Sequence, residues 1–296
     1  MENTRYAYSP IVDREPLRFP NGARIAVWVI PNIEHFHVDK PAASIAPFTA
    51  NLVPDVLNFA WRDYGARVGV WRMIDVMERQ GIRGTAAVNS EVCLHYPQII
   101  EATRELRWDY MGHGQTNSVL IHHQPEDEER ELIRSVLDTL KTHTGQRPKG
   151  WLSPSLTESP RTPDLLAEAG VEYLADWAND EQPYPMKVRN GALISVPYSI
   201  EINDITVFLG CYGTAEDFYQ RIVDQFDVLY EDGAVSGRVM AISLHPFLIG
   251  HGFRSKYLDK ALQHIRARED VWLTTGAEIS DWYRENYLGA EAATTE

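Results

Sequence analysis

Short apolar strands alternate with amphipathic helices along nearly the whole chain, and this alternation most constrains the fold. Runs rich in β-branched residues, such as residues 23–30 and 239–244, predict buried strands. Apolar residues at three- and four-residue spacing, as in residues 125–143, predict helices. This pattern is typical of parallel strands joined by helical crossovers. We therefore expect an α/β fold, and a barrel rather than an open sheet.

The other elements can be placed from the same signals. We expect strands at residues 85–88, 108–111, 150–153, 173–176, 193–200, 205–209 and 271–273. We expect helices at residues 68–80, 97–107, 162–169, 215–230, 257–267 and 277–287. Residues 35–60 have no clear period and predict a long loop. No Gly-, Ser- or Pro-rich linker divides the chain, which predicts one domain over residues 23–288 with an arm (1–22) and a tail (289–296).

Charge and cysteine content exclude several classes of protein. The net charge of −14 argues against nucleic acid and anionic membranes as partners. Cys93 and Cys211 give no disulfide framework, so a reducing compartment is expected. Residues 1–20 lack the apolar core of a secretory signal, and no run reaches the ~18 apolar residues of a membrane span. These features together predict a cytoplasmic protein.

Polar residues follow several of the predicted strands. In a barrel of parallel strands, groups at the carboxyl ends of the strands converge at one mouth. Five residues fit this description: Glu34, His113, Trp151, Asp176 and His245. His113 also lies between two glycines, which permit close approach of backbone or ligand.

The residues at this mouth suit hydrolysis better than other chemistry. The sequence has no Gly-x-Ser-x-Gly elbow, no glycine-rich phosphate loop and no cysteine in a catalytic context. A carboxylate with imidazoles can hold a divalent cation and activate its water, and a separate imidazole can protonate a leaving group. The set therefore indicates metal-assisted or general acid–base hydrolysis of an acyl–nitrogen or acyl–oxygen bond.

Five segments resemble the polysaccharide deacetylase (NodB-homology) family, and within it the allantoinase-like and cytoplasmic peptidoglycan-deacetylase-like branch. They are residues 62–72, 89–93, 112–114, 150–151 and 243–246. The resemblance covers residues 15–287. It implies a distorted (β/α) barrel with fewer than eight full strands, and a hydrolase that acts on carbon–nitrogen bonds other than peptide bonds.

The resemblance also implies roles for individual residues. In the family, an aspartate and two histidines hold a metal, a second aspartate is the base and a late histidine is the acid. Glu34, His113 and Asn117 fall at the metal positions, Asn32 at the base and His245 at the acid. Asparagine is a poor zinc ligand and cannot act as a base. We therefore expect no cofactor or a weakly bound divalent metal such as zinc, with His113, His245 and Glu34 as the catalytic residues.

Six residues are candidates for binding the substrate: Asn32, Arg62, Arg72, Trp151, Asp176 and Trp177. The two arginines belong to a charged set that predicts either an ion-pair network or a clamp for an anionic substrate. Glu158 and Asp180 are candidates for the base that Asn32 cannot supply.

The missing signal peptide and the altered motif favour a small amide or a cyclic ureide or imide as substrate, rather than an acetylated polysaccharide. The alternative is a non-catalytic protein that binds a small molecule on a degraded deacetylase scaffold. The resemblance further implies a homo-oligomer, either a dimer or a tetramer.

Overall fold

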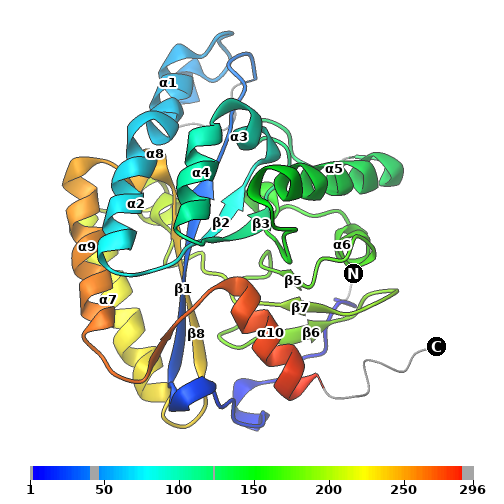
Figure 1. Cartoon of the computed structure of the whole chain (residues 1–296), viewed down its shortest axis with the longest axis vertical. Helices are drawn as coiled ribbons and strands as arrows, with labels where there is room; N and C mark the ends of the chain where they lie inside the picture. The colour runs from blue at the N-terminus through cyan, green and yellow to red at the C-terminus, as the bar shows by residue number, and fades with distance from the viewer. Residues whose placement is uncertain (1–2, 41–46, 123, 289–296) are drawn as a thin grey trace.

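A curled sheet of nine strands organises the chain, which the computed structural model describes over residues 3–40, 47–122 and 124–288 (Figure 1). Its order is β6-β7-β5-β4-β3-β2-β1-β8, and β9 also pairs with β1. All pairs are parallel except β6 with β7. The strands are β1 (Ile25–Ile33), β2 (Thr85–Val88), β3 (Asp109–Gly112), β4 (Gly150–Trp151), β5 (Tyr173–Leu174), β6 (Tyr184–Met186), β7 (Leu193–Ser195), β8 (Arg238–Leu244) and β9 (Val271–Leu273).

Helices lie along the outside of this sheet (Figure 1). They are α1 (Val56–Tyr64), α2 (Val70–Arg79), α3 (Ser90–His95), α4 (Pro97–Glu105), α5 (Glu126–Thr144), α6 (Thr162–Glu168), α7 (Ala215–Asp232), α8 (Pro246–Ile249), α9 (Gly252–Arg266) and α10 (Gly276–Tyr287). Helix α9 contacts both α2 and α7, and α5 contacts α3, α4 and α6. The predicted fold class, a distorted (β/α) barrel, is confirmed.

The central strand β1 is buried along its whole length. Ile25, Val27 and Val29 belong to one apolar cluster, whereas the alternating residues Trp28 and Ile30 belong to a second. Successive side chains of a strand face opposite sides of the sheet, so both faces of β1 are covered. One side of β1 pairs with β8, and β2 and β9 share the other. The carboxyl end of β1 is thereby held in the middle of the fold.

Several predicted elements were wrong. Strand β1 continues past Pro31, because this proline pairs in register with Leu244 of β8. The predicted strand at residues 205–209 is instead a π-helical turn, η6 (Thr206–Gly210), that buries Val207 and Phe208. A short apolar run does not distinguish these two states. Helix α1 lies partly in the predicted loop, and its apolar period is obscured because Val56 and Leu57 are exposed.

The N-terminal arm packs against its own chain. Leu17 and Phe19 are buried, and Arg5 pairs with Asp164 at 2.9 Å. The predicted tail, residues 289–296, lies outside the described residues. In the described parts of the chain, every helix is too short or too polar to cross a bilayer.

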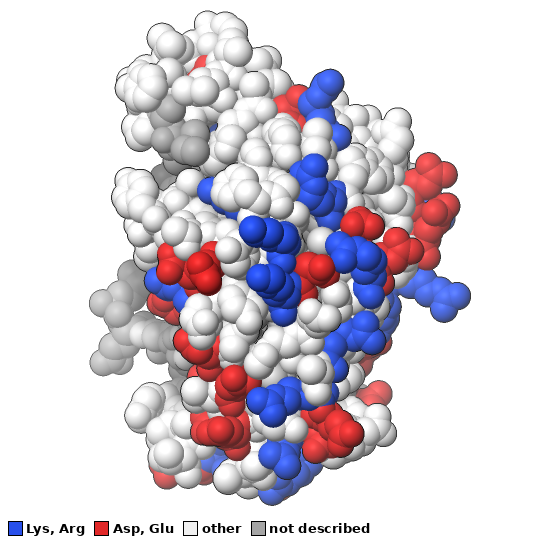
Figure 2. Space-filling model, turned by 90° about the vertical axis from the view of Figure 1, so that its left-hand side faces the viewer, with Lys and Arg blue, Asp and Glu red and all other residues white. Residues whose placement is uncertain are grey.

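Charges of both signs are mixed on the face of the molecule that α2, α7 and α9 form (Figure 2). Arg79 of α2, for example, pairs with Asp259 of α9 at 3.0 Å. On this face, therefore, the acidic side chains do not form one continuous negative patch. A continuous patch of one sign would be needed to steer a charged partner.

Gly69 is predicted to be essential for packing near the end of β8. It lies in η4 (Gly65–Gly69), and a Cβ there would come within 2.0 Å of the Pro246 carbonyl oxygen. Gly69→Ala should therefore force the backbone apart and lower the free energy of unfolding by about 1–3 kcal/mol. Thermal unfolding measures this loss.

Gly252 provides the matched control, because a Cβ at this position of α9 would meet no atom within 4 Å. Gly252→Ala should unfold at the wild-type temperature or above it. Equal melting temperatures for the two variants would contradict the close contact.

Candidate active site

The carboxyl ends of β1, β3 and β8 bring Glu34, His113 and His245 together. Glu34 Oε1 lies 3.5 Å from His113 Nε2 and 3.7 Å from His245 Nε2. All three side chains line one cavity of about 580 Å³. They come together because the carboxyl ends of parallel strands meet at one edge of the sheet.

The cavity has a polar floor and an apolar wall. The apolar wall consists of Phe36, Trp61, Leu120, Leu152, Leu156, Ile200, Ile205, Leu209 and Phe247. Sites for small molecules commonly combine such a wall with a few convergent polar groups.

His245 is held by a buried carboxylate that the sequence did not reveal. Asp204 Oδ1 accepts a hydrogen bond from His245 Nδ1 at 2.7 Å, and Oδ2 accepts the His245 main-chain N–H at 2.8 Å. Burial alone would lower the pKa of His245, but Asp204, with a smaller contribution from Glu34, outweighs it and the pKa is raised. With Nδ1 held by Asp204, the ring directs its Nε2 at Glu34 and the cavity.

His113 is fixed by a main-chain contact. Its Nδ1–H donates to the Leu152 carbonyl oxygen at 2.6 Å, which leaves Nε2 facing Glu34. This buried Nε2 has no hydrogen-bond partner among the described residues. Burial raises the pKa of Glu34, but His113, His245 and Arg62 together outweigh this effect and the pKa is lowered.

Asn117 donates to Glu34 rather than presenting an oxygen. Asn89 Oδ1 accepts the main-chain N–H of His35 at 2.8 Å, and Asn89 Nδ2 donates to the main-chain oxygen of His113. These main-chain partners fix the orientation of Asn89. Asn89 Nδ2 also donates to Asn117 Oδ1 at 2.9 Å, so the Asn117 amide group must donate to Glu34 Oε1.

In this orientation Asn117 does not complete the predicted metal set of Glu34, His113 and Asn117. The Asn117 oxygen is already used by Asn89, and the amide N–H that faces Glu34 cannot be a ligand. Within the described parts of the chain, the residues that could hold a metal ion are His35, Glu91 and His95, whose ligand atoms all lie within 4.8 Å of one another.

Two other predicted substrate-binding residues do line the cavity. The Arg62 guanidinium lies over the Phe36 ring, 4.1 Å from its centroid. Asn32 lines the floor and donates to Ser243 Oγ at 3.0 Å and to the Leu244 carbonyl oxygen at 3.2 Å.

Arg72 and Trp151 do not line the cavity, and the prediction that they bind substrate there was wrong. Arg72 donates to the Gly250 carbonyl oxygen and to Tyr64, so it belongs to a structural network. Trp151 is fully buried in the apolar core, and its Nε1 donates to Ser153. Side chains alternate along a strand, and it is the next residue, Leu152, that reaches the cavity.

Asp176 and Trp177 also lie outside this cavity, next to Glu158. Trp177 Nε1 donates to Glu158 Oε1 at 3.0 Å, and Asp176 Oδ1 accepts the Ser153 N–H at 2.6 Å. Burial raises the pKa of Asp176 to about 6. Burial and the Asp176 carboxylate raise the pKa of Glu158 to about 9, so the pair holds a proton at neutral pH. Glu158 is therefore unsuited to replace the missing base.

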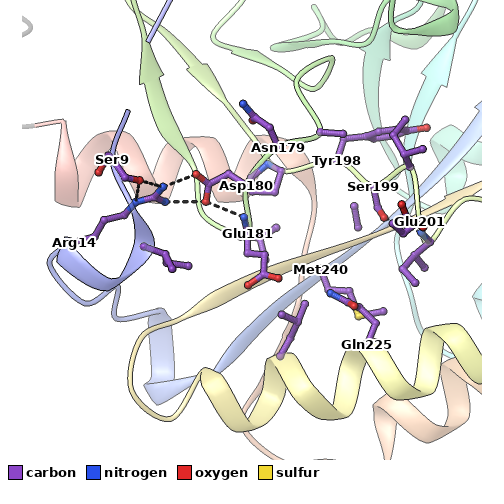
Figure 3. A pocket seen from close by; sticks show the side chains of 18 of the residues that line it. Ser9, Arg14, Asn179, Asp180, Glu181, Tyr198, Ser199, Glu201, Gln225 and Met240 are labelled. Carbon is purple, nitrogen blue, oxygen red and sulfur yellow. Dashed lines mark hydrogen bonds and ion pairs between the residues drawn. The ribbon is translucent and has the colours of Figure 1, made fainter. Parts of the chain in front are cut away.

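A second cavity, of about 640 Å³, lies under the N-terminal arm (Figure 3). Two of its charged side chains, Arg14 and Asp180, pair with each other at 2.6 Å, so the other candidate base, Asp180, is engaged there (Figure 3). Neither His113 nor His245 lines this cavity, although Tyr198 and Ile200 line both. We therefore assign the chemistry to the cavity around Glu34.

The buried proton of Glu158 should make stability depend on pH. A carboxyl whose pKa rises from 4.5 to about 9 on folding makes the folded state bind more protons than the unfolded state between these values. The free energy of unfolding then falls as the pH rises through this window. Glu158→Gln keeps the shape of the side chain but cannot titrate. Between pH 6 and pH 9 its melting temperature should therefore fall less than that of the wild type, and the two falls should differ by ~2–4 °C or more.

Glu101→Gln is the control, because Glu101 is an exposed carboxyl on α4. It should follow the wild type at both pH values. The assignment of the buried proton to Glu158 fails if the melting temperatures of Glu158→Gln and Glu101→Gln fall by the same amount between the two pH values.

Comparisons with known proteins agree with this arrangement of the fold. The family model described as "Polysaccharide deacetylase" matches residues 59–174. A putative polysaccharide deacetylase of Schizosaccharomyces pombe is 27% identical over 297 residues, which span 91% of this chain and 92% of the relative.

Two solved structures are also similar. A probable polysaccharide deacetylase from Pseudomonas aeruginosa PAO1 has a TM-score of 0.83 and 26% identity, and the match covers 93% of this chain and 95% of that chain. The allantoinase Puue has a TM-score of 0.83, 24% identity and the same coverages of 93% and 95%. At this identity, the likeness to the allantoinase shows the fold alone.

Proposed function

We propose that this chain, which carries a polysaccharide deacetylase domain, hydrolyses a carbon–nitrogen bond other than a peptide bond in a small amide or a cyclic ureide or imide. The observation that carries the proposal is the buried Glu34 carboxylate between two imidazole nitrogens, at 3.5 and 3.7 Å, at the floor of a cavity. A carboxylate can act as a base, and an imidazole that carries a proton can act as an acid, within reach of one bound substrate.

The reaction can be written with these residues alone. Glu34 takes a proton from a water molecule as the water oxygen attacks the substrate carbonyl carbon. His245 Nε2 then donates its proton to the nitrogen as the carbon–nitrogen bond breaks, and Asp204 stabilises the charged ring beforehand. The proton on Glu34 can return to His245 across 3.7 Å, which resets the site.

Neighbouring groups orient this pair and balance its charge. The Asn117 amide holds Glu34 Oε1 from one side, and His113 Nε2 lies 3.5 Å from the same oxygen. Arg62 lines the same cavity and lowers the pKa of Glu34. Its positive charge is in place to stabilise the oxyanion that forms during the attack.

The cavity supports a small substrate. A volume of about 580 Å³ with an apolar wall fits a compact molecule with polar groups at one end. The solved relative named as an allantoinase makes a cyclic ureide a reasonable first substrate to test. The non-catalytic alternative has no observation in its favour, because a binding protein does not require an Asp204–His245 pair aimed at a carboxylate.

A substrate panel tests the proposal. Allantoin, hydantoins, succinimide and small N-acetyl compounds should be screened with and without added zinc or manganese, and we expect turnover of at least one compound. On that compound, Glu34→Gln and His245→Ala should each lower kcat by about 10²–10⁴-fold, because each removes a proton-transfer group.

His264→Ala is the matched control. This partly exposed histidine pairs with Asp227 at 2.9 Å, and neither residue lines the cavity. It should leave kcat unchanged. Absence of turnover on the whole panel, with either metal and without, would overturn the proposal in favour of a binding protein.

A further inference from the structure

Directly behind Glu34, the chain gathers a second group of polar side chains that the proposed reaction does not use. Glu34 lines the cavity, whereas the next residue, His35, turns toward α3, where Glu91 and His95 lie four residues apart. Residues at this spacing share one face of a helix. Their ligand atoms and that of His35 all lie within 4.8 Å of one another.

One nitrogen in this group lacks a hydrogen bond. His35 is 8% exposed, and its Nδ1 has no hydrogen-bond partner among the described residues. The nearest carboxylate atom, Glu91 Oε2, is 2.8 Å away, but it is not aligned with a proton on that nitrogen. A buried polar atom without a partner is costly and calls for an explanation.

We propose that His35, Glu91 and His95 bind a divalent metal ion of the zinc class. Two imidazoles and a carboxylate are ligands that zinc prefers, with water completing the coordination. In a tetrahedral zinc site with bonds of ~2.0–2.1 Å, neighbouring ligand atoms lie ~3.3–3.4 Å apart. The ligand atoms of this group, all within 4.8 Å of one another, are near that arrangement. A metal ion would accept the lone pair of His35 Nδ1, and no proton between this nitrogen and Glu91 would then be needed.

The other contacts of the group fit a prepared site. His37 Nε2 donates to Glu91 Oε2 at 2.7 Å, and the His37 main-chain N–H donates to Ser118 at 2.8 Å. We assign His37 as a positioning residue, since ligating carboxylates are commonly oriented by such hydrogen bonds. His95 is exposed, and its ring stacks on that of His35 with centroids 4.4 Å apart, so it can turn toward an ion from solvent.

Such an ion would fix the segment that carries Glu34. The main-chain oxygen of His35 accepts hydrogen bonds from Asn117 N at 3.0 Å and from Thr116 Oγ1 at 2.8 Å. The metal would therefore tie the end of β1 to α3, outside the cavity in which the proposed hydrolysis takes place.

Zinc binding to the substrate-free protein tests this inference. Calorimetric titration with zinc alone, and elemental analysis after dialysis, should find one ion per chain. His95→Ala and Glu91→Gln should each raise the zinc Kd by ~10-fold or more, because each removes a ligand. Zinc should also raise the melting temperature of the wild type more than that of these variants.

Two sets of controls locate the ion. His264→Ala, which changes a histidine outside the group, should bind zinc like the wild type. Glu34→Gln and His113→Ala should also retain the ion, because their side chains line the cavity instead. The inference is overturned if no zinc binds, if His95→Ala binds zinc normally, or if His113→Ala loses it. Because no substrate is involved, these outcomes are independent of whether the proposed hydrolysis is observed.

Discussion

Burial of the Glu34 carboxylate is the constraint on which the rest of the site depends. Its side chain is 6% exposed, and a buried charge is costly unless it is paired and hydrogen-bonded. The chain meets this requirement with His113, His245 and Asn117. Each of these is held in turn by a further partner, the Leu152 carbonyl, Asp204 and Asn89 respectively. The chemistry therefore rests on a network with two levels.

The first level of this network could be predicted from the sequence, but the second could not. Glu34, His113 and His245 follow strands, and parallel strands bring such residues to one edge. Asp204 lies in the helical turn that leads into η6, next to a bridge between Asn203 and Ser243 of β8. The orientation of Asn117 likewise depends on Asn89, which is 28 residues away in the chain. No local sequence pattern encodes contacts of this kind.

The errors at Trp151 and at residues 205–209 have a related cause. Strand β4 has only two residues, so a strand-end position did not show which side chain faces the cavity. Burial of Val207 and Phe208 can be achieved by a strand or by a helical turn, and tertiary packing selects the turn here. The predicted self-association and cytoplasmic location stay predictions.

The most direct test of the account is the pKa of His245, measured by NMR titration of its ring protons in the wild type and in Asp204→Asn. Asp204 raises this pKa against the effect of burial. Removal of the carboxylate should leave burial as the larger influence, so the pKa should fall below that of the wild type. The control Asp227→Asn changes the partner of His264 and should leave the His245 pKa unchanged. An unchanged His245 pKa in Asp204→Asn would contradict the assignment of His245 as the acid.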